Sequence, residues 1–369
     1  MRKAYYRLYN AWVMEKYQPR KVKRAIIIMV YSLYGGGAER VASLLANGFS
    51  KNHPVIVICY AKKEQTYRLA NGVKEIILPP PFIGNYETQQ LLTEKYVRKV
   101  KKTSDAIASI SLMYTMNKLN VKTKYRELVI CSERNNPAKR EPEHMQEIED
   151  IYAAADHVVF QSAVVQGLFG ETVQKHSSIL PNPVTVSCER SGEPKHRIVN
   201  VGRLHPQKNQ KLLIAAFAAF VERHPDYTLS FYGDGDLLND LEQQRDALGL
   251  HDQVIFHGNT ENIHEAISDA EMFVLSSDYE GCSNALLESM IMGIPCISTS
   301  CEGAVDVIRH MHNGMLIKVG DLAGLVEAMT YLADHPDHRE EMGRQGKLLR
   351  EKYEPAAVML QWNSLIEGA

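Results

Sequence analysis

Short apolar runs alternate with amphipathic or irregular stretches along most of the chain. Six runs in the first half have the length and composition of buried strands: 25–30, 55–60, 76–78, 106–110, 128–131 and 157–160. The second half repeats the pattern at 198–201, 229–232, 254–257, 273–275, 295–299 and 314–319. Continuous apolar runs separated by helical segments are typical of parallel sheets that helices cover on both faces. The pattern therefore predicts an α/β protein with two successive domains.

A polar, proline-containing stretch between residues 181 and 197 marks the predicted boundary between the domains. The length of 369 residues also fits two domains of ordinary size. We predict four parts, which are a basic aromatic arm at 1–24, a Rossmann-like domain at 25–190, a second one at 191–353, and a C-terminal helix at 354–369 that crosses back to the first domain.

The charge is distributed unevenly along the chain. Residues 1–190 carry 28 Lys and Arg against 17 Asp and Glu, whereas residues 191–369 carry 14 against 27. Eight of the basic residues lie in 1–24, together with four tyrosines and Trp12. Such an arm suits an anionic membrane surface. We expect contact with a membrane surface rather than with nucleic acid, and a solvated, partly disordered arm is the alternative.

Cysteine spacing and hydropathy narrow the class of protein further. None of the six cysteines belongs to a C-x-x-C pair or a His/Cys cluster, which argues against a zinc site and a disulfide framework. No apolar run approaches the roughly 20 residues of a membrane span, and the N-terminus lacks the apolar core of a signal peptide. We therefore expect a cytoplasmic protein.

The stretch 279–299 combines two acids, a tight loop, a helix and a strand. Glu280 precedes Ser283 and Asn284, which are both good N-cap residues, and Glu288 would lie on the second turn of the helix that starts there. Free N–H groups at a helix start attract anions, and carboxylates accept hydrogen bonds from hydroxyl groups. The stretch predicts a site for a polyhydroxylated, negatively charged ligand, unless both glutamates are simply solvated.

Three further loops follow predicted strands, so they would lie at the carboxyl edge of a sheet, where ligands bind. Arg203 and Lys208 follow the strand at 198–201 and can clamp a diphosphate, although each can also form an ordinary surface salt bridge. Gly36 and Gly37 follow the strand at 25–30 and allow close approach of a phosphate. The third loop, 132–137, is either a polar binding segment or a capping turn closed by a proline.

Taken together, the motifs resemble those of retaining glycosyltransferases of family 4, which have the GT-B fold of two Rossmann-like domains facing across a cleft. The resemblance covers residues 25–366. It rests on Gly202-Arg-Leu-x-x-x-Lys208-Asn, Glu280-Gly-x-x-Asn284-x-Leu-Leu-Glu288-x-Met290, Gly293-x-Pro295 and Gly35-Gly-Gly-Ala-Glu-Arg40. It implies that the first domain is the acceptor side and that the second binds a nucleotide sugar, with UDP as the expected nucleotide.

The resemblance also implies roles for single residues. Arg203 and Lys208 would hold the donor diphosphate, and Glu288 would bind the donor ribose. The remaining donor contacts would be Glu280 and the backbone of Cys282, Ser283 and Asn284 at the sugar, Gly36 and Gly37 at the diphosphate, and Asn259 near the base. We count Arg203, Lys208 and Glu280 as catalytic and expect neither a metal nor a cofactor.

One departure from the family concerns the segment after the strand at 128–131. Many relatives have a histidine there that contacts the donor sugar, whereas this chain has Glu133, Arg134 and Asn135. The Ser-Glu-Arg-Asn form resembles a subgroup of N-acetylgalactosamine-type transferases that act on undecaprenyl-diphosphate-linked glycans. These three residues are therefore possible contacts of the sugar or the acceptor.

The resulting hypothesis is a retaining, metal-independent hexosyltransferase that moves a hexose or N-acetylhexosamine to a polyprenyl-diphosphate-linked glycan, in the biosynthesis of bacterial surface polysaccharide such as capsule or lipopolysaccharide. It would be peripheral on the inner face of the plasma membrane. The alternatives are a catalytically silent GT-B subunit that binds a partner enzyme or lipid, and a sugar-nucleotide epimerase on the same fold.

Overall fold

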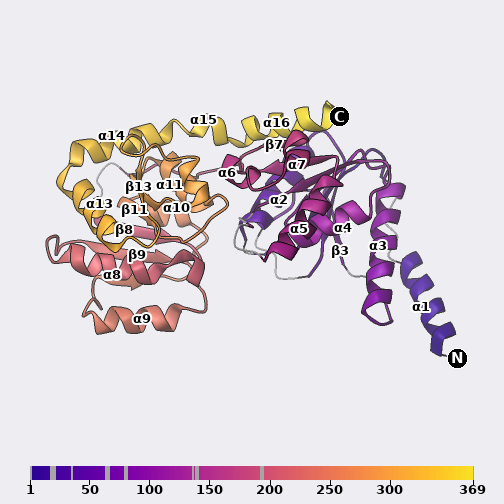
Figure 1. Cartoon of the computed structure of the whole chain (residues 1–369), viewed down its shortest axis with the longest axis horizontal. Coiled ribbons are helices and arrows are strands. Elements are labelled where there is room, and N and C mark those ends of the chain that lie inside the picture. The colour runs from indigo at the N-terminus through magenta and orange to yellow at the C-terminus, as the bar shows by residue number, and fades with distance from the viewer. Residues whose placement is uncertain are drawn as a thin grey trace. The chain divides into compact units, whose positions relative to one another are not determined.

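The computed structural model describes residues 2–16, 22–34, 36–62, 67–78, 82–134, 137, 141–191 and 195–368. The chain divides into two compact units (Figure 1). Unit 1 consists of Met1–Pro183 and Pro355–Ala369, and unit 2 of Val184–Glu354. Each unit is built on one sheet whose strand pairs are all parallel. The predicted α/β class with two parallel-sheet domains is therefore confirmed.

Unit 1 contains a seven-stranded sheet in the order β3-β2-β1-β4-β5-β6-β7. Its strands are β1 (Ile26–Val30), β2 (Val55–Cys59), β3 (Lys74–Ile77), β4 (Ala108–Leu112), β5 (Leu128–Ser132), β6 (His157–Phe160) and β7 (Ser177–Ile179). Its helices are α1 (Arg2–Lys16), α2 (Gly37–Phe49), α3 (Tyr86–Thr103), α4 (Tyr114–Lys122), α5 (Pro142–Ala153), α6 (Ala163–Gln166), α7 (Glu171–Lys175) and α16 (Pro355–Glu367).

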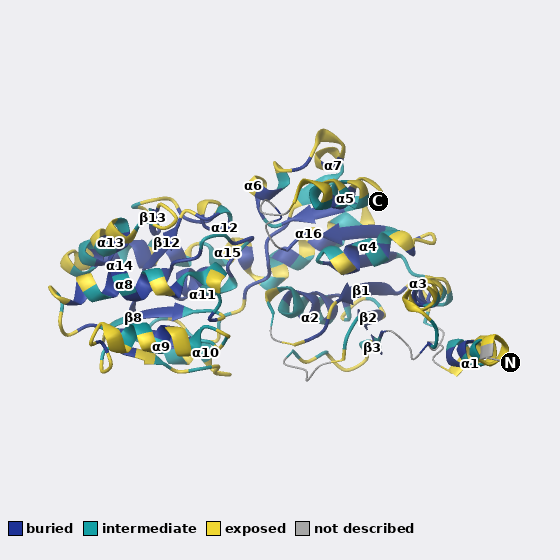
Figure 2. Cartoon of the chain, turned by 60° about the horizontal axis from the view of Figure 1, so that its bottom comes forward, coloured by how far each residue is buried: buried dark blue, intermediate teal, exposed yellow. Residues whose placement is uncertain are grey.

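The central strand β1 explains why the sequence shows an unbroken apolar run. Its alternate residues Ile26, Ile28 and Val30 join a core cluster that includes residues of α2 and α16. Ile27 and Met29 join a different cluster that includes residues of α1 and α3. All five side chains of β1 are buried because both faces of the sheet are covered. In Figure 2 the central strands, such as β1, are dark blue, while exposed residues gather on the outer faces of the helices.

The predicted N-terminal arm contains an ordered helix, α1, that packs against unit 1 beside α3 (Figure 1). The side chain of Val13 is fully buried in the cluster that also contains Tyr96 of α3. Asn10 fixes the helix further, because its Nδ2 donates to the carbonyl of Ile83 at 2.8 Å and its Oδ1 accepts from the Ile83 N–H at 2.8 Å. The partial disorder expected in that alternative was therefore wrong for residues 2–16, which form an ordered helix.

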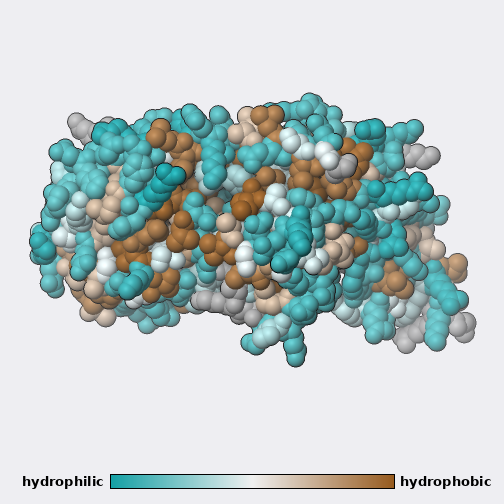
Figure 3. Space-filling model, turned by 45° about the horizontal axis from the view of Figure 1, so that its top comes forward, coloured by the Kyte–Doolittle hydropathy of each residue, from teal (hydrophilic) through white to brown (hydrophobic). Residues whose placement is uncertain are grey.

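Unit 2 contains a six-stranded sheet in the order β10-β9-β8-β11-β12-β13. Its strands are β8 (Lys195–Val201), β9 (Thr228–Tyr232), β10 (Val254–Phe256), β11 (Ala270–Leu275), β12 (Cys296–Thr299) and β13 (Met315–Ile317). Its helices are η1 (Pro206–Lys208), α8 (Gln210–Val221), α9 (Leu238–Ala247), α10 (Ile263–Ile267), α11 (Asn284–Met292), α12 (Glu302–Val305), α13 (Leu322–Asp334), α14 (Pro336–Lys347) and α15 (Arg350–Tyr353). Hydrophilic residues dominate the molecular face drawn in Figure 3, with hydrophobic residues visible between them.

The boundary between the units lies at 183/184, seven residues before the predicted position. Val184 belongs to a core cluster of unit 2, and its N–H donates to the carbonyl of Tyr353 at 2.8 Å. Arg190 Nη1 donates to both carboxylate oxygens of Glu340 at 2.9 Å. The polar residues after Pro183 resemble a linker in the sequence, but they bond to residues of unit 2 that lie about 80 to 170 residues later.

Unit 1 contains a fully buried ion pair. Lys101 Nζ lies 2.8 Å from Glu127 Oε1, and both side chains are 0% exposed. Lys101 also donates to Asn120 Oδ1 at 2.7 Å, and Ser109 Oγ donates to the same oxygen at 2.7 Å. Burial lowers the pKa of Lys101, and the charge of Glu127 opposes that shift. The network satisfies both charges, so losing one partner would leave the other buried and uncompensated.

We predict that Lys101→Ala destabilises the protein by about 3–5 kcal/mol, because it leaves the buried Glu127 carboxylate without its cation. The measurement is the melting temperature by circular dichroism. The matched control is Lys102→Ala, which removes the neighbouring, exposed lysine and should change stability by about 0.5 kcal/mol or less. Equal melting temperatures for the two variants would refute this account of the pair.

Candidate active site

The strand order of unit 2 reverses between β8 and β11. The chain leaves β8 toward β9 on one side of the sheet and leaves β11 toward β12 on the other. Loops that part in this way leave a crevice at the carboxyl edge, which is where open α/β sheets bind ligands. The two loops here, 202–209 and 276–283, carry Arg203, Lys208 and Glu280.

Hydrogen bonds join these two loops to each other. Ser276 Oγ donates to the carbonyl of Lys208 at 2.9 Å, and the N–H of Asp278 donates to the carbonyl of Gln207 at 2.9 Å. Gln207 Nε2 in turn donates to the carbonyl of Tyr279 at 2.9 Å. The loops therefore form one cross-linked structure, although about 70 residues separate them in sequence.

Two backbone features hold the first loop in place. Asn209 has φ 47°, which places it in the left-handed region, and its Nδ2 donates to Asp278 Oδ1 at 2.8 Å. Gly233, at the end of β9, has φ 135°, and a Cβ there would lie only 2.1 Å from the carbonyl oxygen of Gly202. A side chain at position 233 would therefore displace the loop that carries Arg203 and Lys208.

Lys208 and Glu280 form an ion pair between the two loops. Ser277 Oγ donates to the same Glu280 oxygen, Oε1, at 2.9 Å. The side chains of Lys208 and Glu280 are 18% and 9% exposed, so the pair is shielded from water yet still reaches the surface. Because an ammonium group has three N–H donors, Lys208 can keep Glu280 and still donate to a phosphate oxygen.

The second loop runs from Glu280 into α11 as the sequence predicts. Ser283 is the N-cap, and its Oγ accepts from the N–H of Leu286 at 3.4 Å. Gly303 also fixes the loop, because its N–H donates to the carbonyl of Glu280 at 3.1 Å. Burial, with a smaller contribution from Glu280, raises the pKa of the Cys301 thiol to about 11. That thiol is neutral at physiological pH.

Glu288 on α11 has a partner that the sequence did not reveal. Its Oε2 lies 3.1 Å from Nε2 of His264, and Nδ1 of the same ring accepts from the N–H of Ser187 at 3.1 Å. Because a backbone N–H can only donate, the ring proton is on Nε2 and is donated to Glu288. His264 lies 24 residues earlier on another helix, so no local spacing signals the pair. Glu288 and Glu280 are 5% and 7% exposed, so the alternative of two solvated acids was wrong.

The other predicted donor residues of unit 2 lie around the same edge. Arg203 is exposed, and among the described residues no carboxylate lies within ion-pair distance of it. Arg203 and Lys208 lie in the same loop, and of these two cations only Lys208 has an acidic partner among the described residues. Asn259 is exposed in the loop after β10, next to Gly258, whose carbonyl accepts from the N–H of Gly233 at 2.8 Å.

The predicted residues of unit 1 fall into two groups. Gly36 is the N-cap of α2 in an extended conformation, and Gly37 is the first residue of that helix. Glu133 and Arg134 follow β5 and are 2% and 9% exposed. Asn135 lies outside the described residues.

Glu133 and Arg134 take part in hydrogen bonds inside unit 1. Tyr152 donates its hydroxyl to Glu133 Oε2 at 2.6 Å, and the N–H of Arg134 donates to Glu133 Oε1 at 2.9 Å. Arg134 Nη1 donates to Asn182 Oδ1 at 2.6 Å. Burial, followed by the charge of Glu133, raises the pKa of Tyr152 well above its usual value. The carboxylate of Glu133 thus fixes the described residues that follow β5.

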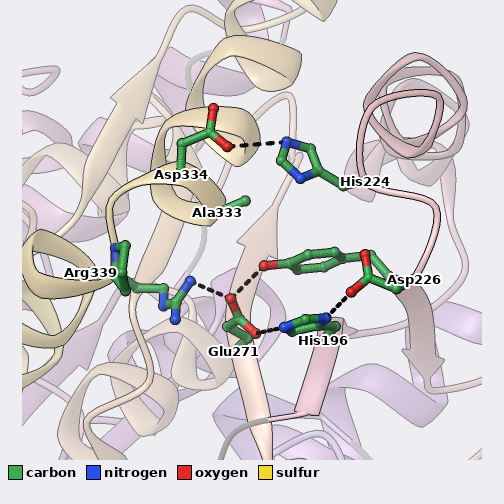
Figure 4. A pocket seen from close by; sticks show the side chains of 9 residues that line it. His196, His224, Asp226, Glu271, Ala333, Asp334 and Arg339 are labelled. Carbon is green, nitrogen blue, oxygen red and sulfur yellow. Dashed lines mark hydrogen bonds and ion pairs between the residues drawn. The ribbon is translucent and has the colours of Figure 1, made fainter.

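A second polar cluster lies at the amino edge of the sheet in unit 2 (Figure 4). Glu271 is buried, pairs with Arg339 and accepts from the hydroxyl of Tyr227, and His196 lies 3.9 Å from its other oxygen. Burial, followed by the hydrogen bond to Glu271, raises the pKa of Tyr227. Because ligands of parallel sheets bind at the opposite edge, we interpret the cluster as a structural solution for a buried carboxylate.

Two features are absent from the described part of the chain. No group of three or more His, Cys, Asp or Glu side chains there is arranged to hold a metal ion. No helix there is both long and apolar enough to cross a membrane.

Comparisons with known proteins show which family the region around the site is similar to. Residues 189–349 match the family model described as glycosyl transferases group 1. The chain is a glycosyltransferase with the GT-B fold. Over 359 residues it is 28% identical to a Campylobacter jejuni enzyme, "GalNAc-alpha-(1->4)-GalNAc-alpha-(1->3)-diNAcBac-PP-undecaprenol alpha-1,4-N-acetyl-D-galactosaminyltransferase", an alignment that covers 92% of this glycosyltransferase and 98% of the relative.

Two further similarities are shorter or more distant. An Escherichia coli enzyme, "UDP-Gal:alpha-D-GlcNAc-diphosphoundecaprenol alpha-1,3-galactosyltransferase", is 28% identical over 174 residues, which is 42% of this glycosyltransferase and 45% of the relative. The crystal structure of Anabaena HepE in complex with UDP superposes with a TM-score of 0.82 at 16% identity, covering 94% of this chain and all of that one. At that identity the structural similarity supports the fold alone.

Proposed function

We propose that this glycosyltransferase is a retaining, metal-independent member of family 4. It would move a hexose or N-acetylhexosamine from a UDP-sugar to a polyprenyl-diphosphate-linked glycan in bacterial surface polysaccharide biosynthesis. The observation that carries the proposal is the Lys208–Glu280 ion pair at the point where the strand order reverses, within the region that matches the family model. The names of the Campylobacter and Escherichia relatives support the lipid-linked acceptor.

In the proposed reaction the bond between the anomeric carbon and the leaving diphosphate oxygen breaks. The acceptor hydroxyl oxygen bonds to the same face of the sugar, and its proton passes to the departing diphosphate. Negative charge builds up on the diphosphate in the transition state. Groups that bind the transition state more strongly than they bind the ground state therefore accelerate the step. Lys208 and Arg203 are the cations placed for that role, and Glu280 and Glu288 would bind hydroxyl groups of the sugar and ribose.

Helix α1 is the proposed contact with the membrane. Tyr5, Leu8 and Trp12 are 59%, 73% and 49% exposed and are spaced to form one stripe along the helix. The opposite side of α1 is fixed to unit 1 by Asn10 and Val13. Basic residues accompany the stripe, and Lys16 Nζ lies 4.5 Å from the ring centre of Trp12. Apolar and aromatic residues flanked by cations suit the interface of an anionic bilayer.

The donor site is tested by thermal shift and sugar-transfer assays with UDP, GDP and ADP sugars, each with and without EDTA. We expect selective stabilisation by one UDP-sugar that EDTA does not change. Lys208→Ala should lower turnover more than tenfold, because about 1.4 kcal/mol of transition-state stabilisation corresponds to each factor of ten. Lys211→Ala, which removes an exposed lysine of α8 paired with Asp240, is the matched control and should keep full turnover.

Melting curves of both lysine variants distinguish a catalytic loss from an unfolded protein. If no nucleotide stabilises the wild type, a noncatalytic subunit becomes the better explanation of the fold.

Retention of configuration is tested on the product. We expect the new glycosidic bond to have the same anomeric configuration as the sugar in the donor, because the acceptor oxygen would enter on the face that the diphosphate leaves. The coupling constant of the anomeric proton in the NMR spectrum of the product reports this directly. An inverted product would exclude the same-face mechanism.

The membrane contact is tested by sedimentation with liposomes that contain anionic lipid. We expect Leu8→Asp to reduce the bound fraction severalfold, because it places a carboxylate in the exposed stripe of α1, and binding should fall as salt rises. Leu360→Asp changes a leucine of similar exposure, 68%, on α16 and is the control. Equal loss in both variants, or binding that salt does not affect, would contradict the proposed role of α1.

A further inference from the structure

Unit 1 has a pocket of about 300 Å³ between α3 and α4. Tyrosines and side chains with amide, hydroxyl or ammonium groups line it, among them Tyr60, Tyr86, Gln89, Gln90, Tyr114 and Lys118. Every lining residue belongs to unit 1. Small-molecule sites are of this size or larger and combine aromatic walls with a few polar groups.

The pocket lies at the carboxyl edge of the sheet in unit 1. Tyr60 directly follows β2. Tyr114 is the first residue of α4, and only Met113 separates it from the end of β4. The strand order of this sheet reverses between β1 and β4, so the position corresponds to the ligand crevice of an open parallel sheet. Tyr31, which follows β1, stacks on Tyr60 with ring centres 5.5 Å apart.

Backbone strain marks the same place. Met113 has φ 72° and ψ 154°, an unfavourable conformation for a residue with a side chain. Its N–H donates to the carbonyl of Ser132 at 3.1 Å, which holds the turn. Strain of this kind persists where the surrounding structure fixes the residue, often at a functional position. Here the turn sets the start of α4 and with it the position of Tyr114.

Each of the two lysines that line the pocket already has a carboxylate partner in unit 1. Lys118 Nζ lies 2.5 Å from Glu147 Oε1, and this hydrogen bond raises the pKa of Lys118. Lys122 Nζ lies 4.0 Å from Glu94 Oε1. A phosphate would have to compete with a carboxylate for each lysine. A neutral ligand could instead use the amide, hydroxyl and N–H groups while it packs against tyrosine rings.

We propose that this pocket binds a neutral sugar residue of the acceptor glycan. Sugars present hydroxyl groups around a ring whose carbon–hydrogen faces pack on aromatic side chains, which matches the balance of tyrosines and hydrogen-bonding groups here. The assignment of this sugar to the acceptor glycan rests on the proposed function. The binding of a neutral sugar by unit 1 does not, because it follows from the pocket itself.

Binding is measured by ligand-observed NMR on the full chain, with methyl α-N-acetylgalactosaminide, methyl α-glucoside and inorganic phosphate as separate probes. We expect saturation transfer to at least one of the glycosides, and no broadening of the phosphorus NMR signal of inorganic phosphate. Tyr86→Ala should reduce the glycoside signal at least fivefold. Tyr86 is 76% exposed, so its loss should leave the fold intact. Tyr125→Ala removes an exposed tyrosine of unit 1 outside the pocket lining and should behave as wild type.

The role in transfer is measured by the KM values for a short-chain lipid-linked glycan and for the nucleotide sugar. In Tyr60→Ala and Tyr86→Ala we expect the KM for the acceptor to rise about tenfold while the KM for the nucleotide sugar stays within about twofold. The proposal is overturned if neither glycoside binds, if phosphate binds in their place, or if Tyr125→Ala has the same effect. Failure of UDP-sugar to bind the wild type would instead refute the proposed function, and the glycoside NMR would still test the pocket.

Discussion

The reversal of strand order in each parallel sheet is the constraint on which the candidate site depends. In unit 2 it falls between β8 and β11, so the loops after these strands become neighbours although about 70 residues separate them. The chain then fixes the loops to each other through Ser276, Gln207 and Asp278. The ion pair between Lys208 and Glu280 is a consequence of this topology, because β8 and β11 are neighbours in the sheet and the two loops follow them.

The ion pairs of the two units differ in a way that separates structure from chemistry. Lys101 and Glu127 are both fully buried, and Arg339 and Glu271 are 9% and 2% exposed in their side chains. These four side chains are fully or almost fully shielded from solvent. Lys208 is 18% exposed and lies at the carboxyl edge, so its ammonium can bind a second anion without leaving Glu280. Partial exposure, not burial alone, is what suits this pair for a ligand.

The fold was predictable from the sequence because short apolar runs with the length of buried strands alternate with helical segments along the chain. The start of α11 was predictable because Ser283 is a good N-cap and Gly293 ends the helix with φ 86°. Partners across the fold were not predictable. His264 for Glu288 and Tyr152 for Glu133 come from elements with no shared local pattern.

The domain boundary was misplaced for the same reason. In the sequence Arg190 looks like a linker residue, because its ion-pair partner Glu340 lies 150 residues later.

The proposed donor would carry its negative charge into the acidic half of the chain. Residues 191–369 hold 27 Asp and Glu against 14 Lys and Arg, so the overall field there opposes a diphosphate. Screening, however, limits that field to about 8 Å at physiological ionic strength. What a diphosphate would meet at close range is Arg203, Lys208 and the N-terminus of α11. Local geometry at the carboxyl edge therefore outweighs net charge, so the charge count alone does not identify the proposed anion site.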